Sequence, residues 1–374
     1  MLQGEDAYKF INDAKNNCIV LGGKCNKSCI FCSCLTQSKV GLKNWTDPID
    51  KTDLQYAIDF IDNSMPIYFG EGVSFLSCEP FLHPKFLELF EEINNHFPQT
   101  VKRITTIGTD ITRAHIDVLL KQNVEIFVSV NTLDKQWRSK LMKNDNYNNL
   151  IYILDVLEEK IKQINLFYLG DLDVLKKDLD RLYNINNNLL QKQILLRLIE
   201  YSKYSPSMVK KIHINSKKSW HAAIEYFDKN VSYPLYWIRE LYNFPQTKMT
   251  KVSYGKFNIH TARNDFNIRI KKALSFVEDN LLDSAILLAE SSYEYFINKY
   301  PEYKDIAIKV ENKTFGGSYI ATPLLTKNDI LNAIITHKKY EYYIASSDIF
   351  SYNLRDLTRN KAIVDYPINL ILVE

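Results

Sequence analysis

Three cysteines near the N-terminus have a spacing that suits an iron–sulfur cluster. Cys25, Cys29 and Cys32 lie in the run GGKCNKSCIFC, residues 22–32. Thiolates at this spacing on one loop can converge on a single cluster. A [4Fe–4S] cluster normally takes four protein thiolates. Three cysteines in strict spacing therefore leave one iron for another ligand.

The distribution of the cysteines argues against a disulfide framework. Five of the six lie between positions 18 and 34, whereas disulfides would spread cysteines over the fold. A structural zinc site is the alternative, because Cys34 supplies a fourth thiolate. Zinc sites usually pair two cysteine knuckles some distance apart, and this sequence has no second knuckle. Cys18, within a predicted strand, is interpreted as a small buried residue.

The residues that position this loop alternate between short apolar runs and longer amphipathic ones. The first strand, 17–21, ends at Gly22-Gly23. Further strands are predicted at 73–76, 103–107, 124–130, 164–169 and 194–199. Helices are predicted at 53–61, 84–93, 111–120, 149–159, 172–183 and 207–227. Six strands that are apolar on both faces and alternate with helices predict a helix-covered parallel sheet, either doubly wound or a partial barrel. In both folds, active residues lie at the C-terminal ends of strands.

The pattern changes after about residue 230, which predicts two domains, 1–230 and 231–374. The second is predicted to be a smaller mixed α/β domain. Its expected elements are helices at 267–298 and 327–335 and strands at 306–310, 318–322, 342–345 and 368–373.

The C-x3-C-x2-C spacing, with Phe31 just before the third cysteine, resembles the signature of the radical S-adenosylmethionine (SAM) superfamily. The resemblance implies an α/β fold, a partial (β/α)6 TIM-like barrel, and a [4Fe–4S] cluster on Cys25, Cys29 and Cys32. In that family the open iron chelates SAM, and reduction of the cluster cleaves SAM to a 5′-deoxyadenosyl radical. The radical abstracts hydrogen from an organic substrate. The implied partners are a peptide or small-molecule substrate and an electron donor such as flavodoxin or ferredoxin.

Other residues match the family's SAM-binding positions. Ser77, Cys78 and Glu79, before Pro80, stand where the family usually has Gly-Gly-Glu, and the resemblance places them toward the methionyl amino group. At the end of the third predicted strand, Ile107 replaces the usual Asn, so any polar role there is lost or moved.

The later strands supply three further candidates. Ser129 is the candidate for contact with the SAM ribose or carboxylate, and Asn131 is expected near the substrate. Arg197, inside an apolar strand, needs an anion. The SAM carboxylate and a nearby Glu are both open as its partner. We therefore expect Phe31 and these polar residues to bind the cofactor. Asp171 is predicted to be a helix N-cap.

The C-terminal part, from Val310 to Asp329 and beyond, resembles the uncharacterised C-terminal domain of a clostridial and cyanobacterial radical SAM group. It has no further cysteine. An auxiliary-cluster domain of the kind found in many peptide-modifying members needs several, so none is expected.

The amino-acid composition limits which partners and which cellular location can be expected. The 374 residues are 46% hydrophobic and 24% charged, with a formal net charge of +3, which indicates neither a nucleic-acid nor a membrane partner. No apolar run is long enough to span a bilayer and the N-terminus has no signal-peptide core, so a cytoplasmic location is expected. The alternative function is a non-catalytic module that binds zinc or an Fe–S cluster through its cysteines and interacts with a partner.

Overall fold

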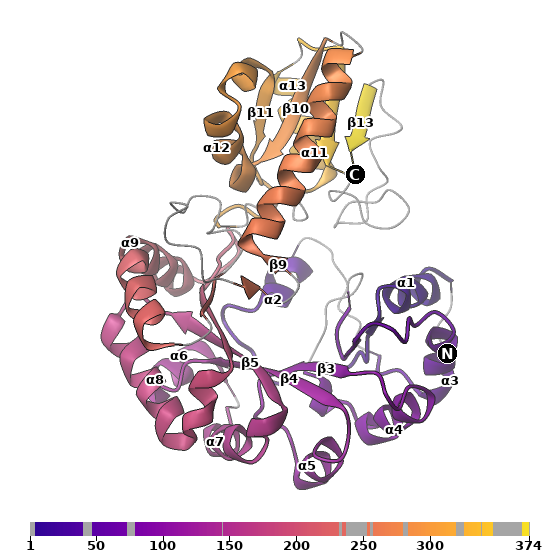
Figure 1. Ribbon diagram of the computed structural model, residues 1–374, viewed down its shortest axis with the longest axis vertical. Coiled ribbons are helices and arrows are strands. Elements are labelled where there is room, and N and C mark those ends of the chain that lie inside the picture. The colour runs from indigo at the N-terminus through magenta and orange to yellow at the C-terminus, as the bar shows by residue number, and fades with distance from the viewer. Residues whose placement is uncertain are drawn as a thin grey trace. The chain divides into compact units, whose positions relative to one another are not determined.

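The computed structural model describes residues 4–39, 47–72, 79–143, 145–231, 234–236, 253–254, 257–279, 283–318, 325–337, 339–346 and 369–373 (Figure 1). The chain divides into two compact units, which are described separately. The first comprises 1–34, 43–199 and 211–234, and the second comprises 35–42, 200–210 and 235–374. The domain boundary at 230/231 stays a prediction.

The first unit contains a seven-stranded sheet whose spatial order is the chain order, β1 to β7. Neighbouring strands from β1 to β6 are parallel. The strands are β1 (Cys18–Ile19), β2 (Ile67–Phe69), β3 (Lys102–Thr106), β4 (Val124–Asn131), β5 (Ile161–Tyr168), β6 (Gln193–Leu198) and β7 (Pro234–Tyr236). A doubly wound sheet reverses its strand order, whereas a barrel adds each strand to the same edge. The sequential order therefore confirms the partial barrel.

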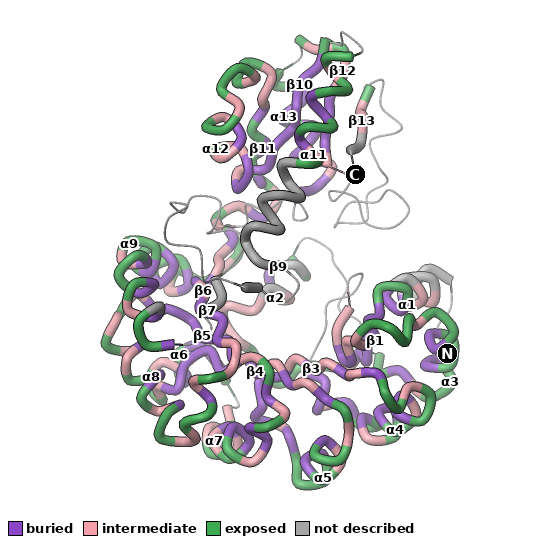
Figure 2. Tube along the Cα trace, viewed as in Figure 1, coloured by how far each residue is buried: buried purple, intermediate pink, exposed green. Residues whose placement is uncertain are grey.

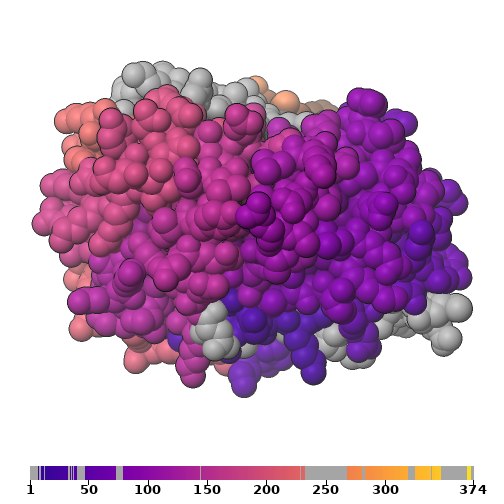
Figure 3. Space-filling model, turned by 90° about the horizontal axis from the view of Figure 1, so that it is seen from below, coloured from indigo at the N-terminus to yellow at the C-terminus, as the bar shows by residue number. Residues whose placement is uncertain are grey.

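Helices lie along the outer side of this curved sheet (Figure 1). The helices that lie within the first unit are α1 (Gly4–Lys15), α3 (Lys51–Ile58), α4 (Phe86–His96), α5 (Arg113–Leu119), α6 (Lys135–Leu141), α7 (Tyr147–Val156) and α8 (Leu172–Ile185). Their outer surfaces form the face shown in Figure 3. Two more helices, α2 (Ser33–Ser38) and α9 (Ser207–Asn230), have residues in both units. Asp171 caps α8 as predicted, because its side chain accepts from the Asp173 and Val174 amides. None of the helices in the described part of the chain combines the length and apolar character of a transmembrane segment.

The expectation of strands that are apolar on both faces was wrong for β3 and β4, whereas consecutive residues of β5 and β6 are buried. Along β4, Val124, Ile126 and Val128 are buried, and the residues between them are partly exposed (Figure 2). The same alternation occurs in β3. The partly exposed residues of β3 and β4 lie on the face opposite to their buried residues, so that face can carry polar side chains.

The second strand of the sheet lies earlier than predicted. β2 (Ile67–Phe69) pairs with both β1 and β3. The predicted strand at 73–76 lies outside the described residues, as do Ser77 and Cys78. The run Ile67-Tyr68-Phe69 is short and follows Pro66, and its strand character depends on the two neighbours with which it pairs.

The second unit has a four-stranded parallel sheet in the order β11-β10-β12-β13. Its strands are β10 (Ser284–Ala289), β11 (Ala307–Val310), β12 (Tyr342–Ser346) and β13 (Asn369–Val373), and its helices include α11 (Ile259–Asp279), α12 (Glu290–Lys299) and α13 (Lys327–Thr336). The strands expected at 306–310, 342–345 and 368–373 and the helix at 327–335 are confirmed. The strand expected at 318–322 lies, except for Ser318, outside the described residues.

The single helix expected at 267–298 was wrong. α11 ends at Asp279, and β10 separates it from α12. All six residues of β10 are buried between β11 and β12. A strand that is apolar on both faces has no alternation, so periodicity does not distinguish it from a buried helix.

Candidate active site

The loop that follows β1 carries the three cysteines. Cys25 is exposed, Cys29 and Cys32 are partly buried, and none of the three forms a disulfide. The Cys32 amide donates to the Cys29 carbonyl oxygen at 3.1 Å, which closes a turn between them. Burial, together with the nearby charges of Cys32 and Cys25, raises the pKa of Cys29 to about 12. The three side chains are thus close enough to repel one another as thiolates, and a cationic cluster relieves that repulsion.

A buried ion pair inside the loop was missed from the sequence. Lys27, between the first two cysteines, is 3% exposed and its Nζ lies 2.9 Å and 2.7 Å from the carboxylate oxygens of Asp110. Asp110 follows the end of β3. The pair therefore ties the cysteine loop to the C-terminal edge of the sheet. The sequence does not indicate this pair, because lysines and aspartates are common and their positions along the chain do not show which of them lie together.

The backbone of the loop is also held by the segment after α6. The Ile30 amide donates to the Leu141 carbonyl oxygen at 3.0 Å, and the Lys143 amide donates to the Lys27 carbonyl oxygen at 2.9 Å. The loop thus has anchors on two neighbouring βα units.

Glu79 reaches the end of β3. Its Oε1 accepts from the Thr106 hydroxyl at 2.5 Å, and its Oε2 accepts from the Ile107 amide at 2.9 Å. Burial raises the pKa of Glu79 to about 7, although both hydrogen bonds lower it. Loss of hydration around its sulfur is the main cause of a raised pKa of Cys25, and the negative charge of Glu79 contributes to it. Glu79 and the first cysteine are therefore neighbours.

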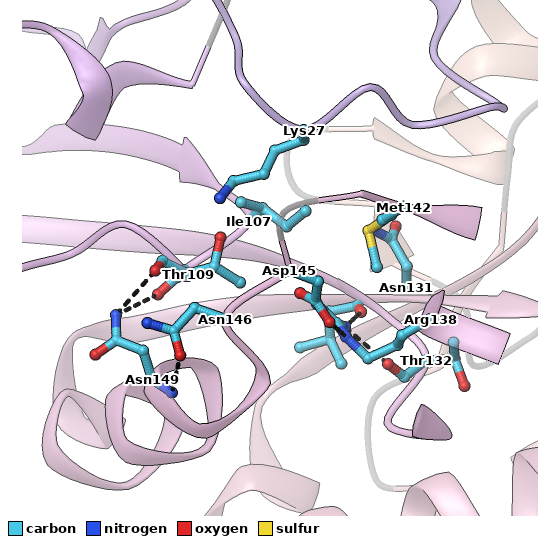
Figure 4. Close-up of polar contacts among 12 residues, drawn as sticks. Lys27, Ile107, Thr109, Asn131, Thr132, Arg138, Met142, Asp145, Asn146 and Asn149 are labelled. Carbon is cyan, nitrogen blue, oxygen red and sulfur yellow. Dashed lines mark hydrogen bonds and ion pairs between the residues drawn. The ribbon is translucent and has the colours of Figure 1, made fainter. Parts of the chain in front are cut away.

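Ile107 acts here through its backbone. Its side chain is buried, and its amide holds Glu79. The turn that follows is fixed by Asn149 on α7, whose Nδ2 donates to the Thr109 and Ile111 carbonyl oxygens at 3.1 Å and 3.0 Å (Figure 4). Gly108 lies in this turn at φ +78°, a backbone conformation that suits glycine. The replacement of the usual Asn at 107 is thus compatible with an ordered strand end.

Ser129 lies on the partly exposed face of β4. Its hydroxyl accepts from the Asn165 Nδ2 on β5 at 3.3 Å, and the Asn165 Oδ1 accepts from Gln163 at 2.7 Å. A row of polar side chains therefore continues from Ser129 across β5. The family resemblance had indicated Ser129 but not these two partners.

Asn131 ends β4 in an unusual turn. Its φ is +65°, it is buried, and its Nδ2 lies 3.8 Å from the Met142 sulfur. The neighbouring carbonyl oxygens of Val130 and Thr132 both accept from Arg138 Nη1, at 2.5 Å and 2.8 Å (Figure 4). Arg138, on α6, was not a candidate from the sequence.

Phe31 and Arg197 both contact Phe167, which lies on β5. The rings of Phe31 and Phe167 pack edge to face, with centroids 4.9 Å apart. The guanidinium carbon of Arg197 lies 5.0 Å from the centre of the Phe167 ring. The fold thereby brings the cysteine loop, β5 and β6 together, with Arg197 at the C-terminal end of its strand.

The residues present suit an iron–sulfur cluster with an amino-acid ligand. Three thiols lie on one loop, where burial and neighbouring thiolates raise the pKa of Cys25 and Cys29. A buried carboxylate lies near Cys25, and a guanidinium lies on β6. Among the described residues, no three His, Cys, Asp or Glu side chains are arranged to hold a single metal ion.

Comparison with known proteins identifies part of the chain. Residues 19–184 match the model of the Radical SAM superfamily. This part of the chain is thus similar to radical SAM domains. No curated protein matches the chain.

Several solved structures are similar to part of the chain. SuiB from Streptococcus suis bound to S-adenosylmethionine is 13% identical, with a TM-score of 0.40, and the match covers 59% of this chain and 49% of that chain. SuiB bound to its precursor peptide SuiA is 16% identical, with a TM-score of 0.40 and coverages of 58% and 47%. Native anSMEcpe with bound AdoMet is 15% identical, with a TM-score of 0.40 and coverages of 63% and 67%. The chain thus spans about half the length of the SuiB chains that it matches.

Proposed function

We propose that this protein reductively cleaves SAM and uses the 5′-deoxyadenosyl radical to abstract a hydrogen atom from an organic substrate. The observation that carries the proposal is the position of Cys25, Cys29 and Cys32 on one loop after β1, with the buried carboxylate of Glu79 near Cys25. The superfamily match of residues 19–184 supports it.

The three cysteines would hold a [4Fe–4S] cluster. When bound, the cluster supplies the electron that breaks a sulfonium C–S bond of SAM, which yields methionine and the 5′-deoxyadenosyl radical. The protein orients SAM and excludes water and oxygen. The Lys27–Asp110 pair and the two backbone bonds to residues 141 and 143 keep the loop in place.

Two charged side chains suit the two charges of the methionyl group of SAM. Glu79, whose carboxylate is buried beside Cys25, would accept from the ammonium, with Ser77 and Cys78 adjacent in sequence. Arg197 would bind the carboxylate, and its contact with Phe167 would fix the direction of the guanidinium. An ammonium beside Glu79 would favour the ionised carboxyl group, which burial alone disfavours.

The polar face of β4 and β5 would bind the rest of SAM and the substrate. Ser129, paired with Asn165, would contact the ribose or the carboxylate, and Asn131 would bind SAM close to the substrate. The substrate would be a peptide or a small metabolite. The electron would come from a flavodoxin or ferredoxin.

The test is anaerobic reconstitution with iron and sulfide, followed by dithionite and SAM. The assay measures 5′-deoxyadenosine by liquid chromatography and iron by colorimetry. Wild-type protein should form 5′-deoxyadenosine, and Cys32→Ala should lose both the product and most of the iron. Cys34→Ala is the matched control, because it removes a thiol two residues away and should keep both.

Two outcomes would contradict the proposal. If the protein binds zinc in preference to iron, and Cys34→Ala loses the metal as readily as Cys32→Ala, the protein is a cysteine-bound metal module. If the cluster forms and SAM remains intact in the presence of dithionite, radical SAM activity fails although the cluster site stands.

A further inference from the structure

The turn at Asn131 is strained. The Thr132 amide donates to the Val130 carbonyl oxygen at 2.8 Å, so Asn131 is the central residue of a γ-turn with φ +65°. This form of the γ-turn is rare and costs free energy. Such strain persists only where surrounding contacts determine the conformation, and it is concentrated at functional sites.

Arg138 supplies those contacts. Its side chain is 1% exposed, and one nitrogen, Nη1, bridges the carbonyl oxygens on both sides of Asn131. Asp145 accepts from Nε and Nη2 at 2.6 Å and 2.5 Å, which orients the guanidinium (Figure 4). A planar fork of donors can make these bonds at once, whereas a lysine ammonium lacks that geometry.

The same helix and the segment after it hold the cysteine loop. The Leu141 carbonyl oxygen accepts from Ile30, and the Lys143 amide donates to Lys27, in the stretch between Arg138 and its partner Asp145. The Arg138–Asp145 pair therefore closes a short segment whose backbone contacts the loop between the first and third cysteines.

The amide of Asn131 has a weak partner. The Met142 thioether, 3.8 Å from Nδ2, is a poor acceptor compared with an oxygen. A buried amide that is held in a strained turn and donates to sulfur is well placed to donate to a stronger acceptor on a bound ligand.

We infer that Arg138 is a positioning residue that fixes two parts of the SAM site at once, the cysteine loop and the γ-turn that presents the Asn131 amide. The inference rests on the proposed function. Arg138 would act by holding the cysteine loop and the turn at Asn131 in place, and it would not itself contact SAM.

Hydrogen exchange of the metal-free protein tests the coupling independently of catalysis. Arg138→Lys keeps the charge and loses the bridge. Exchange at the Thr132, Ile30 and Lys143 amides should become roughly tenfold faster or more. Arg103→Lys is the matched control, because it alters an arginine–carboxylate pair with Glu125 near the other end of β4. It should leave these three amides unchanged.

Kinetics of the reconstituted enzyme give the second readout. Arg138→Lys should raise the KM for SAM by roughly tenfold to a hundredfold, since a displacement of about 1 Å can cost a hundredfold, with a smaller change in kcat and wild-type iron content. Asn131→Gly keeps the left-handed backbone, which glycine adopts without strain, and removes the amide. It should raise the KM for SAM and leave exchange at Ile30 and Lys143 unchanged.

The outcomes separate the inference from the proposed function. Wild-type exchange in Arg138→Lys, or faster exchange at only one of the two parts, overturns the inference whether or not SAM is cleaved. If exchange quickens at both parts and wild-type protein forms no 5′-deoxyadenosine, the coupling stands and the proposed function fails. If exchange quickens and the KM for SAM is unchanged in an active enzyme, Arg138 is structural only, and the inference is wrong.

Discussion

Phe31 on the cysteine loop and Phe167 on β5 pack edge to face, with ring centroids 4.9 Å apart and planes inclined by 77°. Phe31 stands next to the third cysteine, and Phe167 lies beneath the guanidinium of Arg197. One aromatic contact therefore connects the candidate cluster ligands to the candidate ligand of the SAM carboxylate.

The coupling between these two rings can be measured. Phe31→Leu and Phe167→Leu should together destabilise the metal-free protein by less than the sum of the single changes, with a coupling energy of about 0.5–1.5 kcal/mol. Urea unfolding of the four proteins of the cycle measures it. Phe31→Leu combined with Phe90→Leu is the control, because Phe90 packs with Phe69 and Phe86. Additivity in the first cycle would show that the ring contact has no energetic weight.

Glu79→Gln removes the negative charge of this side chain and nearly keeps its shape, so it tests whether the charge contributes to SAM binding. A glutamine can still accept from the Ile107 amide and can donate to the Thr106 hydroxyl, so the fold and iron content should be kept. The loss of the anion should weaken SAM binding by about 1.5–3 kcal/mol, the range of hydrogen bonds to charged groups. Equilibrium binding of SAM to the reconstituted protein measures the change. Unaltered affinity would remove Glu79 from the SAM site.

Lys27→Met should destabilise the metal-free protein by about 3–5 kcal/mol, because it leaves the largely buried Asp110 carboxylate without its partner. Lys27→Met combined with Asp110→Leu should recover much of that loss, since no charge is then buried alone. Lys51→Met is the control. Its pair with Glu92 is exposed on the lysine side and should be worth about 0–1 kcal/mol. Urea unfolding distinguishes the three cases. Equal losses from Lys27→Met and Lys51→Met would contradict the prediction.

Asp178 on α8 should make stability depend on pH. Burial raises its pKa to about 6, although Thr132 and the Leu133 amide donate to it at 2.6 Å and 2.9 Å. Because the folded pKa is raised, the folded protein binds the proton more tightly than the unfolded chain, and stability from this group grows as pH falls below 6. Between pH 7.5 and pH 5, wild-type protein should gain about 1 kcal/mol of unfolding free energy relative to Asp178→Asn.

The measurement is urea unfolding at both pH values. Asp173→Asn, an exposed carboxylate on the same helix, is the control for the loss of one charge and should show no such change. A wild-type advantage over Asp178→Asn that grows with rising pH would reverse the sign and contradict the assigned cause.

The sequence determined those features that depend on local spacing. The spacing of Cys25, Cys29 and Cys32 predicts a cluster loop. The run of strands and helices from residue 100 to 230 was predicted except for α6 (Lys135–Leu141), because periodicity is a property of neighbouring residues. The helix start at Asp171 was predicted for the same reason.

Only the tertiary structure decided what depends on distant partners. The strand order selected a partial barrel over a doubly wound sheet, and the pairing of β10 between β11 and β12 divided the helix expected at 267–298. Lys27 forms an ion pair with Asp110, and Arg138 donates hydrogen bonds to the carbonyl oxygens on both sides of Asn131. Lysine, arginine and aspartate are common on every surface, and their spacing along the chain does not say which of them will be buried together. The residues that orient the site, such as Lys27 and Arg138, could therefore be recognised only from their contacts in the folded protein.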